Sequence, residues 1–249
     1  MKGWFENMHL PVLNVAAESI PERMLVVGDP ERALRVASRF EDRVQLGHFR
    51  EYLTLVGKHR GVEVGVVSHG VGAAGAAVAF DELFQAGVRR VIRAGSCGGM
   101  QDEVLDGHLV IVTGAVRNEG LSSQLVPDGY PAVASPDIVT ALRRAARGGE
   151  NIHEGLTLTN AVFYTNDILG SNLPLWQKAG VKAVEMECAA LFVMAGLVGR
   201  ECGAILTVDG NPLVERDEEM TGYNPHREIV REAVGRMIGI ALDALVDNQ

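Results

Sequence analysis

Residues 62–95 read VEVGVVSHGVGAAGAAVAFDELFQAGVRRVIRAG and decide the fold of this chain. Within this stretch, an apolar, β-branched run (62–69) precedes an alanine-rich helical pattern (73–87), and a second apolar run (88–95) follows. Short apolar runs of this kind are typical of buried strands, and the order strand, helix, strand places two parallel strands in one sheet. The stretch therefore predicts an α/β fold.

The same alternation continues on both sides of this unit. Nearly continuous apolar strands need helices on both faces of their sheet. We therefore predict a single domain over residues 1–249, with a central mixed, mostly parallel β-sheet flanked by helices. The acidic stretch 211–224 is the best candidate for a mobile loop, with a plain solvated connection as the alternative. The other expected strands are 24–28, 108–116, 155–164, 181–187 and 203–209, and the other expected helices are 30–40, 135–146, 188–199 and 225–246.

Composition narrows the possible functions. The chain has 23 Lys and Arg against 32 Asp and Glu, a formal net charge of −9, so it lacks the basic excess that nucleic-acid binding requires. Its three cysteines, Cys97, Cys188 and Cys202, have neither a disulfide nor a metal-ligand spacing. The N-terminus lacks the apolar core of a signal peptide, and no run of about 20 apolar residues is present. We expect a cytoplasmic protein without a metal, a nucleic-acid partner or a membrane partner.

The glycines of GVGAAG (70–75) resemble a dinucleotide-binding loop, because they follow an expected strand and open an expected helix. Such a loop needs an acidic residue about 20 positions later to bind the ribose hydroxyls. This sequence has Arg90 and Arg93 there. We therefore interpret the glycines as a place where the backbone approaches a small ligand or where the helix packs on the strand.

Two further motifs suggest an anion site at strand ends. Asp29 and Pro30 follow Gly28 and suit the start of a helix, which explains them completely as local structure, whereas Arg32 one turn later adds a cation beside the helix N-terminus. Arg93 lies in an apolar strand and must have a partner, either a buried carboxylate or a bound anion. We favour the anion, because the turn that follows offers the Ser96 hydroxyl and free amides.

Three acidic residues end other apolar runs. Glu185 and Glu187 can either complement the dipole of the next helix or lie on one face of a strand and bind a vicinal diol. Asp209 can either start a turn or supply an acid. Strand-end motifs at Gly28, Gly70, Arg93, Glu187 and Asp209 should meet at one sheet edge, and together they suit a phosphate, a sugar and a leaving group that needs a proton.

With these motifs the sequence resembles the nucleoside phosphorylase family of the hexameric, bacterial type, which includes purine nucleoside and uridine phosphorylases. The resemblance covers nearly the whole chain, from His9 to the last helix. It implies reversible phosphorolysis of a nucleoside to a free base and ribose 1-phosphate by a pentosyltransferase, with inorganic phosphate as co-substrate and no cofactor. It also implies a homo-oligomer, a hexamer built as a trimer of dimers with shared active sites. The matching motifs are VGDP (27–30), SHGVG (68–72), DEL (81–83), IRAGSCG (92–98), VEME (184–187) and VD (208–209).

The resemblance also implies roles for individual residues. Arg93 and Asp209 would be catalytic, and Asp209 would need to be protonated to donate to the leaving base. His9 would reach the 5′ hydroxyl across a dimer interface, and Glu187 would bind the 2′ and 3′ hydroxyls. Phosphate would be bound by Gly28, Arg32, Arg93, Ser96 and, from a neighbouring subunit, Arg50. The nucleoside would be bound by His9, Phe163, Glu185, Met186, Glu187 and Asp209.

The preferred base is predicted from two features. Uridine phosphorylases carry a glutamine and an arginine just beyond the aromatic residue, where this chain has Asn166, Asp167 and Ile168. A purine leaves most easily when N7 is protonated, and Asp209 can supply that proton. We therefore predict a purine nucleoside phosphorylase, with a uridine phosphorylase, a nucleosidase and a non-catalytic nucleoside-binding protein as alternatives. An arginine that assists the acid could be Arg216, Arg227 or Arg231.

Overall fold

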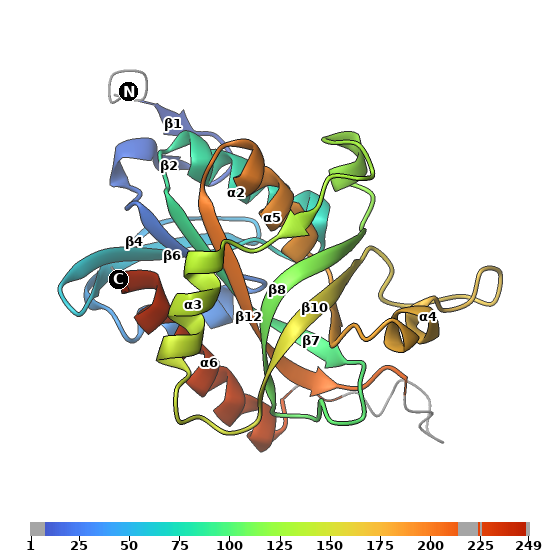
Figure 1. The fold of residues 1–249 in the computed structure, drawn as a ribbon. Helices are drawn as coiled ribbons and strands as arrows, with labels where there is room; N and C mark the ends of the chain where they lie inside the picture. Colours follow the sequence, from blue (N-terminus) through green and yellow to red (C-terminus); the bar gives the residue numbers. More distant parts are fainter. Residues whose placement is uncertain (1–7, 214–223, 225, 248–249) are drawn as a thin grey trace.

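The structure of the protein is a computed structural model that describes residues 8–213, 224 and 226–247 (Figure 1). It has the expected α/β architecture, with a ten-stranded mixed sheet covered by helices. Most of the expected loop 211–224 lies outside the described residues. The strands of the sheet are β3 (Arg23–Val27), β4 (Glu41–Phe49), β5 (Tyr52–His59), β6 (Val62–Ser68), β7 (Arg90–Gly99), β8 (Leu109–Asn118), β9 (Ala132–Val133), β10 (Ile152–Asn160), β11 (Ala183–Glu185) and β12 (Glu201–Gly210).

The sheet combines a closed ring of strands with an open extension. Its order is β11-β10-β8-β12-β7-β3-β6-β5-β4, and β9 pairs with β8. An additional pairing of β11 with β7 closes β7, β12, β8, β10 and β11 into a ring. β3, β6, β5 and β4 continue outward from β7. The ring therefore brings β11 beside the middle of the sheet, although the path of the sheet starts with it.

Parallel pairing positions the strand ends that the sequence singled out. β3 lies between β6 and β7 and is parallel to both, and β12 is parallel to β7. Their carboxyl ends therefore meet at one edge, where Gly28, Ser96 and Asp209 lie. The sheet is mixed, as expected, and parallel and antiparallel pairings are equally numerous among its described strands. Two of the antiparallel pairings involve β4 and β5, which the sequence did not predict.

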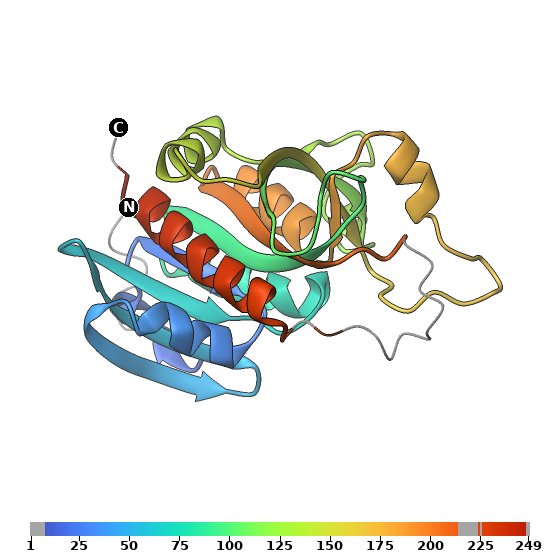
Figure 2. The ribbon, with the colours of Figure 1, turned by 90° about the horizontal axis from the view of Figure 1, so that it is seen from below.

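Helices cover both faces of the sheet. α6 packs on β3, β7 and β12 beside α3, and α5 packs on β8 and β12 beside α2. α1 lies next to α6, because Arg35 and Arg39 donate to main-chain carbonyls of Arg231 and Gly235. α4 extends away from this body with the segment before it (Figure 2). The helices are α1 (Pro30–Ala37), α2 (Ala73–Gln85), α3 (Pro136–Ala145), α4 (Leu173–Lys178), α5 (Cys188–Leu197) and α6 (Glu228–Val246).

The first helix starts as the sequence predicts. The Asp29 carboxylate accepts a hydrogen bond from the main-chain N–H of Arg32 at 2.7 Å, and Pro30 is the first helical residue. This cap fixes α1 directly after β3 and keeps Gly28 at the strand end. None of the described helices is long and apolar enough to cross a lipid bilayer.

A buried carboxylate attaches the N-terminal hairpin to the body. The hairpin pairs β1 (His9–Leu10) with β2 (Val15–Ala16). Glu82 on α2 accepts hydrogen bonds from the N–H groups of Val12 and Leu13, both at 2.8 Å, and is itself buried. Glu82 therefore provides acceptors for two main-chain N–H groups in the turn of the hairpin and fixes the hairpin, which carries His9, on α2.

We expect Glu82→Gln to lower the free energy of unfolding by about 1–3 kcal/mol. The side-chain NH₂ group of glutamine would replace one carboxylate oxygen, so the N–H group of Val12 or of Leu13 would lose its acceptor. Denaturant unfolding measures the change. Asp81→Asn is the matched control, since Asp81 is exposed and bonds to Gln85, and its effect should stay within about 0.5 kcal/mol. Equal effects of the two variants would contradict the role of Glu82.

Candidate active site

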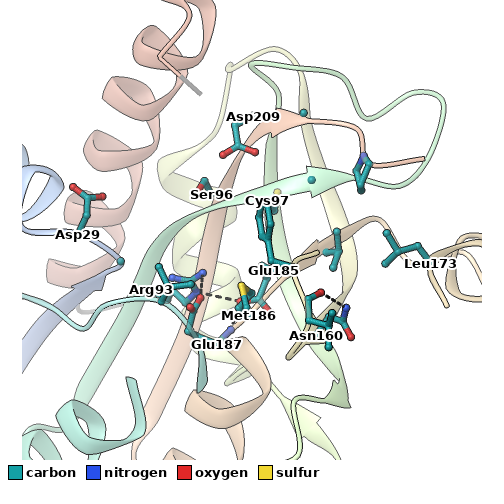
Figure 3. A pocket seen from close by; sticks show the side chains of 18 of the residues that line it. Asp29, Arg93, Ser96, Cys97, Asn160, Leu173, Glu185, Met186, Glu187 and Asp209 are labelled. Atoms are coloured by element: carbon teal, nitrogen blue, oxygen red, sulfur yellow. Dashed lines mark hydrogen bonds and ion pairs between the residues drawn. The ribbon is translucent and has the colours of Figure 1, made fainter. Parts of the chain in front are cut away.

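A cavity of about 650 Å³ lies at the carboxyl ends of β3, β7 and β12 and extends to the segment that follows β10 (Figure 3). Nine of the eleven residues that the sequence assigned to phosphate, nucleoside or catalysis line it. In Figure 3, Asp209 lies on one side of Ser96, and Arg93 and Glu187 lie on the other. The nine are Gly28, Arg32, Arg93, Ser96, Phe163, Glu185, Met186, Glu187 and Asp209.

The other two predicted residues, His9 and Arg50, do not line the cavity of their own chain. His9 is exposed on β1, and its Nε2 lies 3.0 Å from Oδ1 of Asn14. Arg50 is exposed in the turn between β4 and β5, where its guanidinium lies 5.3 Å from the ring centre of Phe49. Neither side chain therefore contributes to the cavity of its own chain, and the resemblance assigns both to the site of a neighbouring subunit.

Arg93 is the central cation of the cavity. It is 3% exposed, its Nε lies 3.3 Å from Oε2 of Glu185, and its Nη2 lies 2.5 Å from Oε2 of Glu187. Burial acts to lower the pKa of Arg93, but the carboxylates of Glu187 and Glu185 outweigh it, and the pKa is raised above its ordinary value. The structure thus gives Arg93 two buried carboxylate partners, the alternative that the sequence analysis left open beside a bound anion.

Glu185 supports this cluster from β11. Its Oε2 accepts hydrogen bonds from the N–H groups of Glu187 and Cys188, both at 2.8 Å, and its Oε1 accepts one from the Thr159 hydroxyl at 2.6 Å. Glu185 therefore closes the N-terminus of α5, as the helix-terminus alternative predicted. The strand ends at Glu185, so Glu187 reaches the same cavity from the position that precedes the helix and not from the strand itself.

The glycine loop holds Glu187. The N–H of Gly72 donates to Oε1 of Glu187 at 2.6 Å. Gly70 and Gly72 have φ values of +75° and +94°, a backbone conformation that favours glycine. A Cβ at Gly70 would also lie 2.9 Å from Cγ of Glu51. The backbone of the glycine loop therefore approaches another group closely, and that group is the Glu187 carboxylate of the same chain.

A second cation lies at the end of β3. Nε of Arg32 is 3.6 Å from Oδ2 of Asp29. Burial lowers the pKa of Arg32; the charge of Asp29 opposes the shift, and the charge of Arg93 adds to it. With Gly28 and Ser96 at the ends of β3 and β7, the two guanidinium groups make this part of the cavity suitable for an anion.

Asp209 is buried at the end of β12, on the side of the cavity away from Glu187. Burial raises the pKa of the neighbouring Cys97 thiol well above its ordinary value, and the charges of Asp209 and Glu185 raise it further. Nη2 of Arg227 donates to the main-chain carbonyl of Asp209 at 3.0 Å and lies 2.7 Å from Oδ2 of Asp106.

The position of Arg227 bears on the assisting arginine that the sequence left open. Arg227 holds the main chain of Asp209, whereas Arg231 pairs with Glu228 on the surface of α6 at 3.6 Å. Arg216 lies outside the described residues. Of the two described candidates, Arg227 is therefore the one that contacts Asp209.

Sequence reasoning missed part of the cavity wall, which includes Asn160, Val162 and Leu173. Asn160 ends β10, its Oδ1 accepts from Nδ2 of Asn118 at 2.6 Å, and its Nδ2 donates to the carbonyl of Val162 at 2.8 Å. Leu173 and Val162 add apolar surface to the cavity. A polar residue at a strand end was a usable signal for Asn160, whereas the loop residues follow no periodic pattern.

A family model described as the phosphorylase superfamily matches residues 22–247. The chain belongs to the phosphorylase superfamily. The purine nucleoside phosphorylase of Plasmodium falciparum (isolate 3D7) is 36% identical over 234 residues, which cover 93% of this chain and 94% of the relative. The uridine phosphorylase of Treponema pallidum (strain Nichols) is 34% identical over 209 residues, which cover 80% of this chain and 81% of the relative.

A solved structure of this superfamily confirms the fold. The crystal structure of purine nucleoside phosphorylase from Toxoplasma gondii in complex with immucillin-H superposes with a TM-score of 0.89 and 30% identity, covering 98% of this chain and 97% of that chain. The resemblance noted in the sequence is thereby confirmed. Because the relatives are nucleoside phosphorylases, this member of the superfamily is an enzyme of the pentosyltransferase class.

His69 lies fully buried between the glycine loop and Phe80. Its Nδ1 is 2.9 Å from the carbonyl oxygen of Gly70, so the proton of the neutral ring is on Nδ1, because a carbonyl can only accept. Nε2 has no hydrogen-bond partner in the described part of the chain. Burial lowers the pKa of His69 to about 3, and the charge of Arg93 contributes to the shift.

This depressed pKa predicts a pH dependence of stability. Between about pH 6.5 and pH 3 the unfolded chain binds a proton on His69 and the native chain does not, so stability falls as the pH falls, by up to about 1.4 kcal/mol per unit. Denaturant unfolding measures the free energy of unfolding at pH 7 and at pH 5. Its decrease between these two pH values should be about 2 kcal/mol smaller for His69→Gln than for the unmodified protein. His48→Gln, at an exposed position, is the control, and parallel curves for His69→Gln and the unmodified protein would refute the assignment.

Proposed function

We propose that the protein is a purine nucleoside phosphorylase, which converts a purine nucleoside and phosphate into the free base and ribose 1-phosphate. The observation that carries this proposal is the buried acid Asp209, which lies in the same cavity as the Arg93 and Glu187 pair and on its opposite side. A leaving base and an attacking anion have to approach a sugar from opposite sides, and this arrangement suits both.

The cationic part of the cavity is proposed to bind phosphate. Arg32 and Arg93 would contact its oxygens, with the Ser96 hydroxyl and the N–H groups near Gly28 as further donors. Glycosidic bond cleavage passes through an oxocarbenium-like sugar, so an anion held below C1′ stabilises the transition state and supplies the nucleophile. Arg93 would share its charge between this phosphate and Glu187.

Glu187 and Met186 are proposed to bind the ribose. An ionised carboxylate accepts about four hydrogen bonds, and the described structure uses those from Gly72 and Arg93. The 2′ and 3′ hydroxyls can occupy the remaining positions. Glu185 is a positioning residue in this scheme, because both of its oxygens hold Arg93, Thr159 and the start of α5.

Asp209 is proposed to donate a proton to N7 of the purine as the glycosidic bond breaks. The protonated carboxylic acid is the form that can donate. Arg227 would keep the acid in place through its main-chain carbonyl. Phe163, Val162 and Leu173 provide an apolar surface for the base.

The uridine alternative is supported by the relative from Treponema pallidum, and the structure offers one observation against it. A uracil leaves as an anion and is best served by amide and guanidinium donors, whereas the residue at the end of β12 is a carboxylic acid. Asn166, Asp167 and Ile168 also lack the guanidinium that the uridine enzymes carry after the aromatic residue. A nucleosidase would not need the paired cations Arg32 and Arg93.

The exposed positions of His9 and Arg50 support a shared active site. Each lies outside the cavity of its own chain, and each matches a residue that serves a neighbouring subunit in the family. We propose a homo-oligomer, a hexamer built from dimers, in which these two side chains complete the ribose and phosphate sites of a partner.

We expect Asp209→Asn to lower the kcat for inosine about 10²- to 10⁴-fold, the usual contribution of general acid catalysis, with a nearly unchanged KM for phosphate. Steady-state assays with inosine, adenosine, guanosine and uridine, each with and without phosphate, measure this. Faster cleavage of uridine than of inosine by the unmodified protein would overturn the purine assignment. Base release without phosphate would indicate a nucleosidase.

We expect two inactive variants, His9→Ala and Glu187→Gln, to regain activity when their subunits are mixed, because a hybrid interface contains one site with both native residues. Subunits are exchanged by mild denaturation, and activity is measured after refolding. Each variant refolded alone is the control. Failure of the mixture to exceed these controls, or full activity of a monomer, would contradict the shared site.

A further inference from the structure

A second cavity, of about 340 Å³, lies at the opposite ends of the strands that build the active site. β3 begins at Arg23, β7 at Arg90 and β12 at Glu201, and all three of these residues line the second cavity. Arg89 and Arg200 precede β7 and β12 and also line it. Ser96 lies six positions after Arg90 on β7, so roughly 20 Å separates the two cavities along this strand.

The charge in this cavity is unbalanced. Its described lining contains four arginines and two glutamates, with Gly199 as the uncharged residue. Glu201 is paired with Arg90, whose Nε lies 2.7 Å from its Oε2, and Nη1 of Arg90 also donates to the carbonyl of Asp247. Among the described lining residues, the arginines therefore outnumber the glutamates by two. An excess of positive charge therefore faces this cavity.

Arg200 carries the most informative atom. Its Nε is fully buried and has no hydrogen-bond partner in the described part of the chain. A buried donor of a charged group without an acceptor is costly, so an acceptor from outside the chain would relieve a real penalty. Arg89, which has no ion pair in the described part of the chain, lines the same cavity.

Backbone hydrogen bonds hold these arginines in place. The N–H groups of Arg89 and Arg90 both donate to the carbonyl of Glu22, at 2.9 and 3.1 Å, and the N–H of Glu201 donates to the carbonyl of Arg89 at 2.9 Å. The N–H of Arg200 donates to the carbonyl of Ala195 at 2.9 Å. The segments that carry the guanidinium groups are therefore fixed before any ligand arrives, which lowers the entropic cost of binding.

We propose that this cavity is a second anion site, distinct from the active site, which binds a phosphate group. Guanidinium groups match the geometry of phosphate oxygens and bind them in pairs. No aromatic side chain is among the described lining residues, so the cavity offers no stacking surface for a base. The ligand class is therefore a free phosphate or a small polar phosphomonoester such as a sugar phosphate.

Isothermal titration with inorganic phosphate and, separately, with glucose 6-phosphate tests this proposal on the full-length protein. The unmodified protein should show two classes of phosphate site. Arg89→Gln with Arg200→Gln should weaken one class about 10²- to 10⁴-fold, because each of the two lost charge-assisted hydrogen bonds contributes about one to two powers of ten. Arg32→Gln should weaken the other class, and Arg147→Gln, at an exposed arginine of the surface, should change neither.

The outcomes separate the possible meanings of the cavity. If glucose 6-phosphate binds the Arg89 and Arg200 class more tightly than inorganic phosphate does, the ligand is a phosphomonoester; the reverse order indicates the free anion. A single class that Arg32→Gln removes overturns the proposal. So does a double variant with unchanged anion binding and an altered molar mass by light scattering, which would make the cavity a contact between copies of the chain.

Two further variants keep the test valid if the double variant does not fold. The exposed Arg89 tolerates glutamine without disturbing the core, so Arg89→Gln alone still tests the site if Arg200→Gln does not fold. Arg200→Lys keeps the charge but removes the buried Nε, and it should retain part of the affinity. Phosphorolysis at saturating phosphate should be unchanged in Arg89→Gln, because that residue lies outside the active site. Unchanged anion binding by Arg89→Gln and Arg200→Lys would overturn the proposal.

Discussion

The buried guanidinium of Arg93 and its two carboxylates are the interaction on which the rest of the site depends. Glu185 joins Arg93 to the start of α5 and to Thr159 on β10, and Glu187 joins it to the glycine loop at Gly72. Removing one member would leave a charge buried without a partner, which typically costs 3–5 kcal/mol. Four elements that are distant in sequence are thus held in register by one cation.

Local patterns in the sequence predicted much of this fold. The βαβ unit of residues 62–95, the cap at Asp29 and the strand-end position of Arg93 all follow from periodicity and short-range chemistry. β4 was missed because nearly all of it is solvent-exposed, so it lacks the alternation of a half-buried strand. The direction of β11 was also out of reach, since the closure of a ring fixes the orientation of a strand of three residues, and its own side chains do not.

The sequence likewise predicted one part of the candidate site and missed another. Residues that contact phosphate or ribose in the proposed scheme lie at strand ends, where buried neighbours fix their positions, and the sequence identified them. The surface proposed for the base comes from the segment after β10 and from the start of α4, where neither hydrogen-bond ladders nor a long periodic pattern constrain the sequence. Enzymes that share one sugar and phosphate chemistry can therefore differ in base preference through these segments, as the purine and uridine relatives of this chain illustrate.

The closed ring has a consequence for how the protein avoids aggregation. Because β11 pairs back onto β7, one end of the sheet has no free edge, and β4 is left as the long exposed edge strand. Exposed edges recruit other strands unless charge or irregularity prevents it. β4 opens with Glu41, Asp42 and Arg43, and its pairing with β5 shifts register twice, between Glu41 and Val44 and between Gln45 and Gly47. The exposed charged residues and the irregular pairing made β4 hard to predict from the sequence. The same features protect this strand from unwanted pairing with other strands.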